Sequence, residues 1–179
     1  MPEGFQGYIQ VYTGSGKGKT TAALGLALRA AGRGLRTYFG QFLKGRMSGE
    51  ALAAAKLAPQ LVIESFGRKG FVVVTEGGPP DDEDIARAEQ GLARCREAMR
   101  SGSYDIVVLD EACVAVDLGL LREAAVLEFL DEKPAGIEVV LTGRGATPAL
   151  LERADLVTEM VERKHYFAKG VRARDGIEK

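Results

Sequence analysis

The sequence predicts an α/β fold with a mostly parallel sheet of about six strands and helices on both faces. Short apolar runs rich in β-branched residues alternate with helix-length segments along almost the whole chain, and internal repeats and low-complexity stretches are absent. Strands separated by helix-length segments need crossover connections, which produce parallel pairing and cover both faces of the sheet. The predicted strands are residues 8–12, 36–42, 61–66, 105–110, 137–142 and 156–161.

Two helices are predicted between these strands. Residues 20–31 are apolar nearly all round, which suits a helix buried against the sheet, and Gly32 and Gly34 are expected to end it. From about residue 81 to residue 100, apolar residues recur at steps of three and four, which is typical of a surface helix that packs one face inward. This apolar stripe consists of Ile85, Ala88, Leu92, Cys95 and Met99.

Four consecutive acidic residues, Asp81 to Asp84, open the second of these helices. Such a cluster can hold a metal ion, but acids in a first helical turn also complement the positive end of the helix dipole. We favour the dipole interpretation.

The composition indicates one domain over residues 1–179, with residues 163–179 as a candidate mobile C-terminal tail. A hydrophobic content of 46% suffices for a core, and a net charge of -1 creates no field that would attract nucleic acid or an anionic membrane. Two cysteines, Cys95 and Cys113, cannot form a disulfide framework or a four-thiolate zinc site, and both are interpreted as packing residues. Residues 1–4 do not resemble the start of a signal peptide, and no apolar run reaches about 20 residues. We therefore expect a cytoplasmic protein without nucleic-acid or membrane partners.

The strongest motif is a glycine-rich segment, residues 13–21 (TGSGKGKTT), between the first predicted strand and the first helix. Glycines let successive backbone N–H groups point into one concavity, and the following helix adds the positive end of its dipole, so the segment is expected to bind phosphates. Lys19 would neutralise phosphate charge and the Thr20 hydroxyl would bind a divalent cation, as in a P-loop. The usual P-loop has a glycine five positions before Gly18, whereas here Thr13 stands at that position and Gly14 follows it. The sequence thus predicts a phosphate loop of altered geometry.

Charged residues follow two other predicted strands. Asp110 and Glu111 end one buried strand, and carboxylates at the carboxyl end of a parallel strand emerge where open α/β sheets bind ligands. They are candidate ligands of a magnesium ion that Thr20 also holds. Arg144 follows the next strand and could offer a fork of donors to phosphate oxygens. The alternative for Arg144 is an ordinary surface arginine with a solvated head.

Several segments together resemble one family, the P-loop type of corrinoid (cob(I)alamin) adenosyltransferase. They occur in the family's order and span nearly the whole chain. The matching segments are residues 13–21 (TGSGKGKTT), 41–45 (QFLKG), 49–50 (GE), 104–111 (YDIVVLDE), 141–144 (LTGR), 154–160 (ADLVTEM), 164–165 (KH), Gly170 and 176–178 (GIE).

The resemblance implies a P-loop NTPase-like (RecA-like) fold and transfer of the 5′-deoxyadenosyl group of ATP to the cobalt of a reduced corrinoid, with release of triphosphate. It also implies that ATP lies reversed in the loop. The substrates would be ATP and cob(I)alamin or a corrinoid precursor, with Mg²⁺ or Mn²⁺ as the ion, an electron donor for cobalt and a homodimeric assembly. The triphosphate would be held by Arg144 and by the loop residues Gly14, Ser15, Gly16, Lys17, Gly18, Lys19, Thr20 and Thr21; the catalytic residues would be Lys19, Thr20 and Arg144, and the metal ligands Thr20, Asp110 and Glu111.

The corrinoid side of the site is expected to involve Phe71 and His165. Many relatives carry a tryptophan in the segment that corresponds to residues 71–74, whereas this chain has none. Phe71 is a candidate apolar wall that disfavours an axial cobalt ligand, with an ordinary core aromatic as the alternative. His165, the only histidine, is expected either near the corrinoid or as a residue that orders the tail.

Two other functions remain open from the residues. The glycine-rich loop and Asp110–Glu111 alone would equally suit a small P-loop kinase or phosphohydrolase. A third hypothesis is a nucleotide-dependent regulatory module, in which bound ATP sets the shape of residues 67–80 or of the tail.

Overall fold

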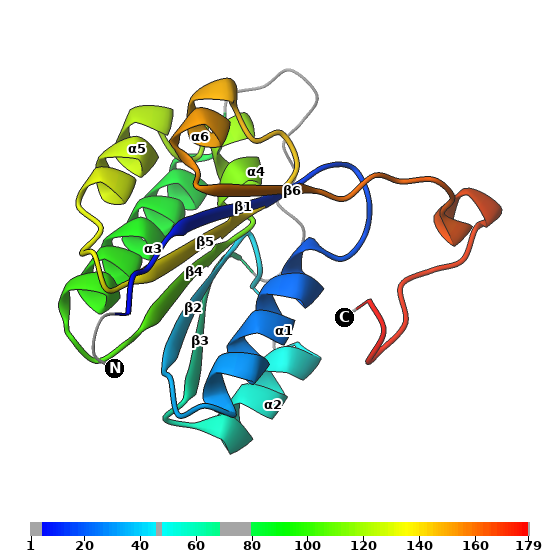
Figure 1. The fold of residues 1–179 in the computed structure, drawn as a ribbon. Coiled ribbons are helices and arrows are strands. Elements are labelled where there is room, and N and C mark those ends of the chain that lie inside the picture. Colours follow the sequence, from blue (N-terminus) through cyan, green and yellow to red (C-terminus); the bar gives the residue numbers. More distant parts are fainter. Residues whose placement is uncertain (1–4, 46–47, 69–79, 179) are drawn as a thin grey trace.

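Six parallel strands form the centre of the structure, a computed structural model that describes residues 5–45, 48–68 and 80–178 (Figure 1). Their order across the sheet is β3-β2-β4-β5-β1-β6, and all five neighbouring pairs are parallel. The predicted α/β class and all six predicted strands are confirmed. The strands are β1 (Ile9–Thr13), β2 (Thr37–Phe42), β3 (Leu61–Phe66), β4 (Ile106–Asp110), β5 (Glu138–Thr142) and β6 (Leu156–Glu159).

The register brings the carboxyl ends of the central strands together at one edge of the sheet. Tyr12 of β1 lies opposite Thr142 of β5, and Gln41 of β2 lies opposite Asp110 of β4. These four residues come from distant parts of the chain, yet they stand in one row because the sheet is parallel throughout. Any site at this edge therefore draws side chains from several loops.

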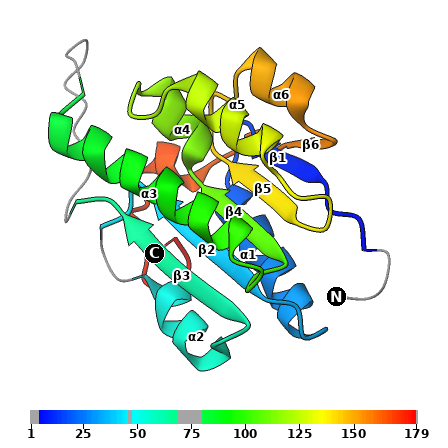
Figure 2. The ribbon, with the colours of Figure 1, turned by 90° about the vertical axis from the view of Figure 1, so that its left-hand side faces the viewer.

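Helices cover both faces of the sheet, as predicted (Figures 1 and 2). One face carries α1 and α2, whose small residues pack on Phe39, Val108 and Val140. The opposite face carries α3, α4, α5 and α6, and it contains the larger apolar cluster, which includes Phe42 and Phe129. The helices are α1 (Lys19–Ala31), α2 (Gly49–Leu57), α3 (Asp82–Arg100), α4 (Ala112–Asp117), α5 (Glu123–Asp131), α6 (Pro148–Arg153) and a 3-10 turn, η1 (Tyr166–Lys169).

The two predicted helices are present, with one correction for α1. Ala23, Ala27 and Ala30 are buried, but Leu28 is 59% exposed, so α1 buries one face instead of being enclosed all round. Alanines suit this face because they allow a helix to approach the sheet closely. The helix ends at Ala31, and Gly34 adopts a φ of 78° just beyond it, which favours glycine.

Helix α3 buries most of its predicted stripe, including Ala88, Leu92 and Cys95. Asp81 caps its first turn by accepting a hydrogen bond from the amide of Glu83. Asp84 is buried and binds the guanidinium of Arg68 at 2.7 and 2.5 Å. These acids therefore cap the helix and pair with an arginine. Both cysteines are buried and free, and Cys113 lies inside α4.

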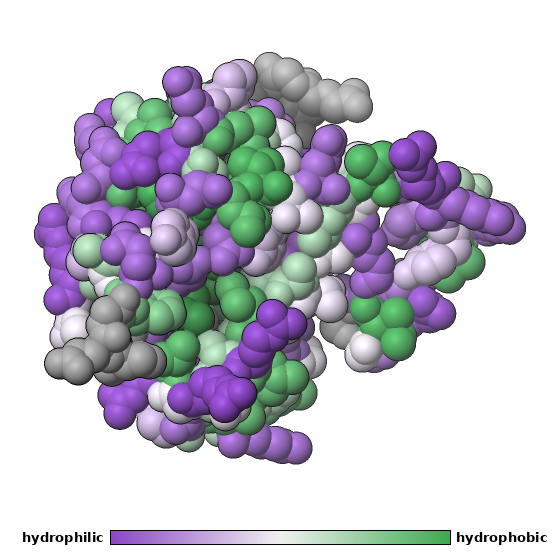
Figure 3. Space-filling view, viewed as in Figure 1, coloured by the Kyte–Doolittle hydropathy of each residue, from purple (hydrophilic) through white to green (hydrophobic). Residues whose placement is uncertain are grey.

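After β6 the chain leaves the body of the protein as a tail that returns towards α1 (Figure 1). Apolar side chains lie over β6 and recur along the tail (Figure 3), and those of Leu156, Val157, Val161 and Phe167 are exposed. In the described ranges, no helix combines the length and apolar character needed to cross a membrane.

Candidate active site

The glycine-rich loop joins β1 to α1, and its glycines are required by a close backbone contact. Gly14 has a φ of 96°, and a Cβ atom added to it would lie 2.5 Å from the carbonyl oxygen of Met160. A Cβ atom on Gly16 would lie 2.7 Å from the same oxygen, which accepts a hydrogen bond from the Gly16 amide at 2.6 Å. The backbone after β6 thus packs directly against the loop at Gly14 and Gly16. This contact gives a physical reason for glycine at position 14.

Lys19 lies at the first position of α1 with its side chain folded over the loop. Its Nζ donates hydrogen bonds to the carbonyl oxygens of Gly14 and Gly16, both at 2.8 Å. Burial lowers the pKa of Lys19, while the nearby carboxylate of Glu111 opposes that shift. An ammonium group has three donors, so two bonds to the loop leave one for a ligand.

A chain of polar side chains connects α1, β4 and β5. The Thr20 hydroxyl donates to Oδ1 of Asp110 at 2.8 Å, and the Thr142 hydroxyl donates to the same oxygen at 2.7 Å. The Thr142 oxygen in turn accepts a bond from the amide of Glu111 at 2.9 Å. Asp110 is fully buried, and its carboxylate holds the hydroxyl groups of Thr20 and Thr142 in position.

Glu111 has a left-handed backbone with a φ of 64°, unusual for a residue other than glycine. Its side chain is directed towards the loop, and burial together with the charge of Asp110 raises the pKa of Glu111. Since strained backbone conformations concentrate at functional sites, Glu111 is a candidate ligand-binding residue on structural grounds as well.

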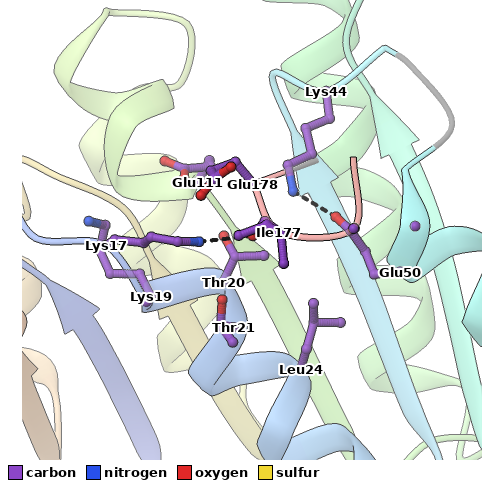
Figure 4. A pocket seen from close by; sticks show the side chains of 13 residues that line it. Lys17, Lys19, Thr20, Thr21, Leu24, Lys44, Glu50, Glu111, Ile177 and Glu178 are labelled. Carbon is purple, nitrogen blue, oxygen red and sulfur yellow. Dashed lines mark hydrogen bonds and ion pairs between the residues drawn. The ribbon is translucent and has the colours of Figure 1, made fainter. Parts of the chain in front are cut away.

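The pocket in front of the loop has a volume of about 590 Å³, which suits a nucleotide (Figure 4). It brings together most of the predicted phosphate residues with Glu111, and adds side chains from the loop after β2, from α2 and from the tail. The lining residues are Lys17, Gly18, Lys19, Thr20, Thr21, Leu24, Lys44, Gly49, Glu50, Glu111, Gly176, Ile177 and Glu178.

Sequence reasoning assigned no role to Lys44 and Glu50, although both belong to matched family segments. The Nζ of Lys44 lies 2.9 Å from Oε1 of Glu50 and 3.6 Å from Oδ2 of Asp110. Gln41 donates to the same Glu50 oxygen at 3.1 Å. Hydrogen bonds from Lys44 and Gln41 outweigh burial and lower the pKa of Glu50 to about 2. Their place in the matched family segments, residues 41–45 and 49–50, was the available signal.

The end of the tail forms one wall of the pocket. The Nζ of Lys17 donates to the carbonyl oxygen of Ile177 at 3.1 Å, as the dashed line in Figure 4 marks. Glu178 accepts hydrogen bonds from the Tyr166 hydroxyl and from Arg174, which hold the turn together. The terminal turn is thus ordered by its own side chains and bound to the phosphate loop.

Arg144 lies beside the loop, but it lines a neighbouring pocket of about 430 Å³ together with Thr13, Gly14 and Ser15. It is exposed, and its charge contributes to the lowered pKa of Lys19. Arg144 therefore lies close to the predicted phosphate site, but it is not one of the residues that line the pocket of Lys19.

Of the two residues predicted for the corrinoid, the structure describes only His165. Phe71 lies outside the described residues. His165 lies in the tail, where its Nδ1 accepts a hydrogen bond from the Phe167 amide at 3.0 Å and its ring packs against Tyr166 at 4.7 Å. His165 thus caps the start of η1, and its role towards the corrinoid stays a prediction.

The oxygen donors at this edge suit a magnesium ion that is completed by substrate. Within the described ranges, no cluster of three or more histidine, cysteine or acidic side chains is placed to hold a metal alone. Magnesium binds through one or two protein oxygens, phosphate oxygens and water, so Thr20 and Glu111 next to the phosphate loop fit it.

A parallel α/β sheet with a glycine-rich loop before α1, followed by Lys19 and Thr20, defines a nucleotide-binding protein of the P-loop class. Comparison with known sequences narrows this class. A sequence model of the family described as "ATP:corrinoid adenosyltransferase BtuR/CobO/CobP" matches residues 5–178. The chain belongs to this family of ATP-dependent transferases.

Individual relatives agree with the family match. A corrinoid adenosyltransferase of Pseudomonas aeruginosa is 36% identical over 97% of this chain and 84% of its own length. Similar proteins of the same name occur in a Sinorhizobium species, at 38% identity with 97% and 80% covered, and in Escherichia coli K12, at 37% with 97% and 86% covered.

Proposed function

We propose that this chain transfers the 5′-deoxyadenosyl group of ATP to the cobalt(I) of a reduced corrinoid and releases triphosphate. A bond forms between cobalt and the ribose C5′, and the bond between C5′ and the oxygen of the α-phosphate breaks. The two electrons of the new bond come from cobalt(I), and the electrons of the broken bond leave with the triphosphate. The observation that carries this proposal is the pocket lined by Lys17, Lys19, Thr20 and Glu111 in a chain of the adenosyltransferase family.

The phosphate loop would hold the triphosphate, with the adenosine sugar facing the acceptor. Lys17 and Lys19 place two cations at the pocket, and Thr20 and Thr21 add hydroxyl groups. Arg144 would contact phosphate oxygens from the neighbouring pocket, which it lines together with Gly14 and Ser15. Gly14 and Gly16 pack against the backbone of Met160, so the loop has a different shape from that of the usual P-loop. This difference supports an unusual placement of the phosphates.

A magnesium ion would be held by Thr20 and Glu111 and by phosphate oxygens. Glu111 lines the pocket, whereas Asp110 is fully buried and bonded to Thr20. We therefore assign Asp110 the role of positioning Thr20 and Glu111 the role of direct ligand. When bound, the ion would neutralise charge that develops on the leaving triphosphate.

The residues of the pocket match a reaction that needs no general base. Cobalt(I) is already a strong nucleophile, so the protein has to orient ATP and stabilise the departing anion. Lys17 and Lys19 and the positive end of α1 supply such stabilisation. A kinase would also need a group that accepts the proton of an acceptor hydroxyl. Glu111 could serve there, so the distinction requires product analysis.

The decisive experiment incubates the protein with ATP, magnesium and chemically reduced cobalamin and identifies the products. Intact triphosphate with adenosylated corrinoid supports the proposal. ADP would indicate a kinase or phosphohydrolase, and tight ATP binding without turnover would indicate a regulatory module. Lys19→Ala should lower kcat by about 10²-fold or more while circular dichroism remains unchanged. Near-normal activity of this variant would contradict the site.

Assembly, reductant and location form the remaining part of the proposal. A homodimer is supported by the exposed apolar side chains of Leu156, Val157 and Val161 on and after the edge strand β6. Cobalt(I) requires an electron donor, and the free thiols of Cys95 and Cys113 are compatible with a reducing cytoplasm.

A further inference from the structure

Lys44 reaches the nucleotide pocket from the side opposite the phosphate loop. It follows β2, whereas Lys17 and Lys19 precede and begin α1, and all three line the same pocket (Figure 4). In Figure 4 its side chain extends towards Glu50, with Thr20 and Glu111 lying between it and the loop lysines. Cations on both sides of one pocket are suited to a ligand with several negative charges.

The backbone that carries Lys44 is held in one conformation. Leu43 has a φ of 63°, and in the described ranges only Glu111 shares this feature among residues other than glycine. A Cβ atom on Gly45 would lie 1.7 Å from the carbonyl oxygen of Arg68, so the loop packs backbone to backbone against the chain after β3. A left-handed residue thus follows each of two neighbouring strands, Leu43 after β2 and Glu111 after β4. Strained conformations concentrate at functional sites, and both Lys44 and Glu111 line the pocket.

The side chain of Lys44 is equally constrained. Glu50 lies 2.9 Å and Asp110 lies 3.6 Å from its Nζ, and Gln41 donates to both carboxylates at 3.1 and 3.4 Å. The charges of Asp110 and Glu50 raise the pKa of Lys44 despite its burial, so it stays protonated at neutral pH. The side chain is still 33% exposed and lines the pocket.

We propose that Lys44 is a second triphosphate-binding cation, which contacts the phosphate chain from the side opposite Lys19, and that Glu50 is the residue that positions it. This inference rests on the proposed function. As the bond to C5′ breaks, negative charge increases on the departing triphosphate, and a cation fixed on the far wall stabilises it without reorganisation. Glu50 and Gln41 hold the ammonium in place before ATP arrives.

A purely structural link between β2 and β4 is the competing explanation, because Lys44 also contacts Asp110. Lys44→Gln separates the two. Glutamine keeps a hydrogen-bond donor for Glu50 or Asp110 but removes the positive charge. Lys44→Arg keeps the charge, and Lys56→Met on α2 is a matched control because Lys56 is exposed and does not line the pocket.

The experiment measures kcat, KM for ATP and the inhibition constant of inorganic triphosphate for each variant, together with the thermal midpoint. We expect Lys44→Gln to weaken triphosphate inhibition at least tenfold and to lower kcat by about 10²-fold, with a loss in thermal midpoint no larger than that of Glu50→Gln, which breaks the same ion pair. Lys44→Arg should recover most of the inhibition, Glu50→Gln should weaken it less than Lys44→Gln, and Lys56→Met should leave all values unchanged. Increasing salt should weaken inhibition less in Lys44→Gln than in the unchanged protein.

An unchanged inhibition constant in Lys44→Gln would overturn the assignment, as would a loss that Lys44→Arg does not recover. Failure of the proposed function gives a different pattern. If Lys19→Ala weakens triphosphate inhibition and Lys44→Gln does not, the phosphate loop stands and only the role of Lys44 fails. If the unchanged protein forms no adenosylated corrinoid and releases ADP, the proposed reaction fails.

Discussion

The hydroxyl of Thr20 donates a hydrogen bond of 2.8 Å to Oδ1 of Asp110, and so joins the first turn of α1 to the end of β4. The two residues lie 90 positions apart. Asp110 also accepts from Thr142 of β5 and lies 3.6 Å from the Nζ of Lys44, so one buried carboxylate connects α1, β5 and the loop after β2.

Thr20→Ala should therefore affect both the metal site and the fold. Loss of the hydroxyl removes a proposed magnesium ligand, and we expect kcat to fall about 10²-fold with a higher magnesium requirement. Asp110 loses one of its donors, which should cost about 1–3 kcal/mol in the free energy of unfolding. Thr20→Ser keeps the oxygen and serves as the control. Magnesium titrations of activity, with urea unfolding, measure both effects; equal losses in the serine variant would contradict this role of the hydroxyl.

Substitution by alanine should have opposite effects at two glycines, Gly14 of the phosphate loop and Gly25 of α1. In Gly14→Ala the new methyl group meets the Met160 carbonyl in a left-handed backbone, so we expect a loss of about 1–3 kcal/mol in stability and weaker ATP binding. Gly25 lies within α1 with no neighbour within 4 Å of an added Cβ atom. Gly25→Ala should therefore stabilise the protein by about 0.5–1 kcal/mol. Denaturant unfolding and calorimetric ATP titration test both variants, and a tolerated Gly14→Ala would be incompatible with the contact.

The lowered pKa of Glu50 predicts a dependence of stability on acid. Its pKa of about 2 in the folded state lies below the ordinary value of 4.5, so its ionised form stabilises the fold above about pH 4.5. That contribution should disappear as the pH falls from 4.5 to 2. The difference in free energy of unfolding between the unchanged protein and Glu50→Gln should consequently shrink between pH 6 and pH 3 in urea titrations. A difference that stays constant over this range would rule out the ion pair with Lys44.

The hydrogen bond between Lys17 and the Ile177 carbonyl predicts that removal of residues 176–179 weakens ATP binding. The truncation removes a pocket wall and one hydrogen bond, about 1 kcal/mol or about fivefold in Kd. The thermal midpoint should change little, because Ile177 is 57% exposed and contributes no core contact. Ile177→Ala keeps the backbone acceptor and should show a smaller effect in calorimetry. A truncated protein with full ATP affinity would argue against a role for the tail in binding.

The sheet and the phosphate loop could be predicted because their signals are local. Apolar runs separated by helix-length segments indicated all six strands, and the spacing of glycines with Lys19 and Thr20 indicated the loop. Parallel topology then explained why Glu111 shares a pocket with the loop, since carboxyl ends of strands gather at one edge. The short helices α2, α4, α5 and α6 were not assigned, because few turns give weak periodicity.

The residues that sequence reasoning missed depend on strand order and on contacts between distant segments. Lys44 and Glu50 enter the pocket because β2 pairs with β4, and no local pattern encodes that neighbour relation. Ile177 reaches the loop through a tail whose path is set by Tyr166, Arg174 and Glu178. Arg144 shows a different limit of sequence reasoning. The strand before it, β5, was predicted correctly, but the side chain of Arg144 lines an adjacent pocket.

The position of the tail also has a practical consequence for handling the protein. A purification tag or fusion partner joined directly after Glu178 would begin at a residue that lines the ATP pocket. Gly7 lies at the opposite end of the sheet, where its amide bonds the carbonyl of Ala135. Affinity tags and immobilisation linkers for kinetic work should therefore be placed before Gly7 and not directly after Glu178.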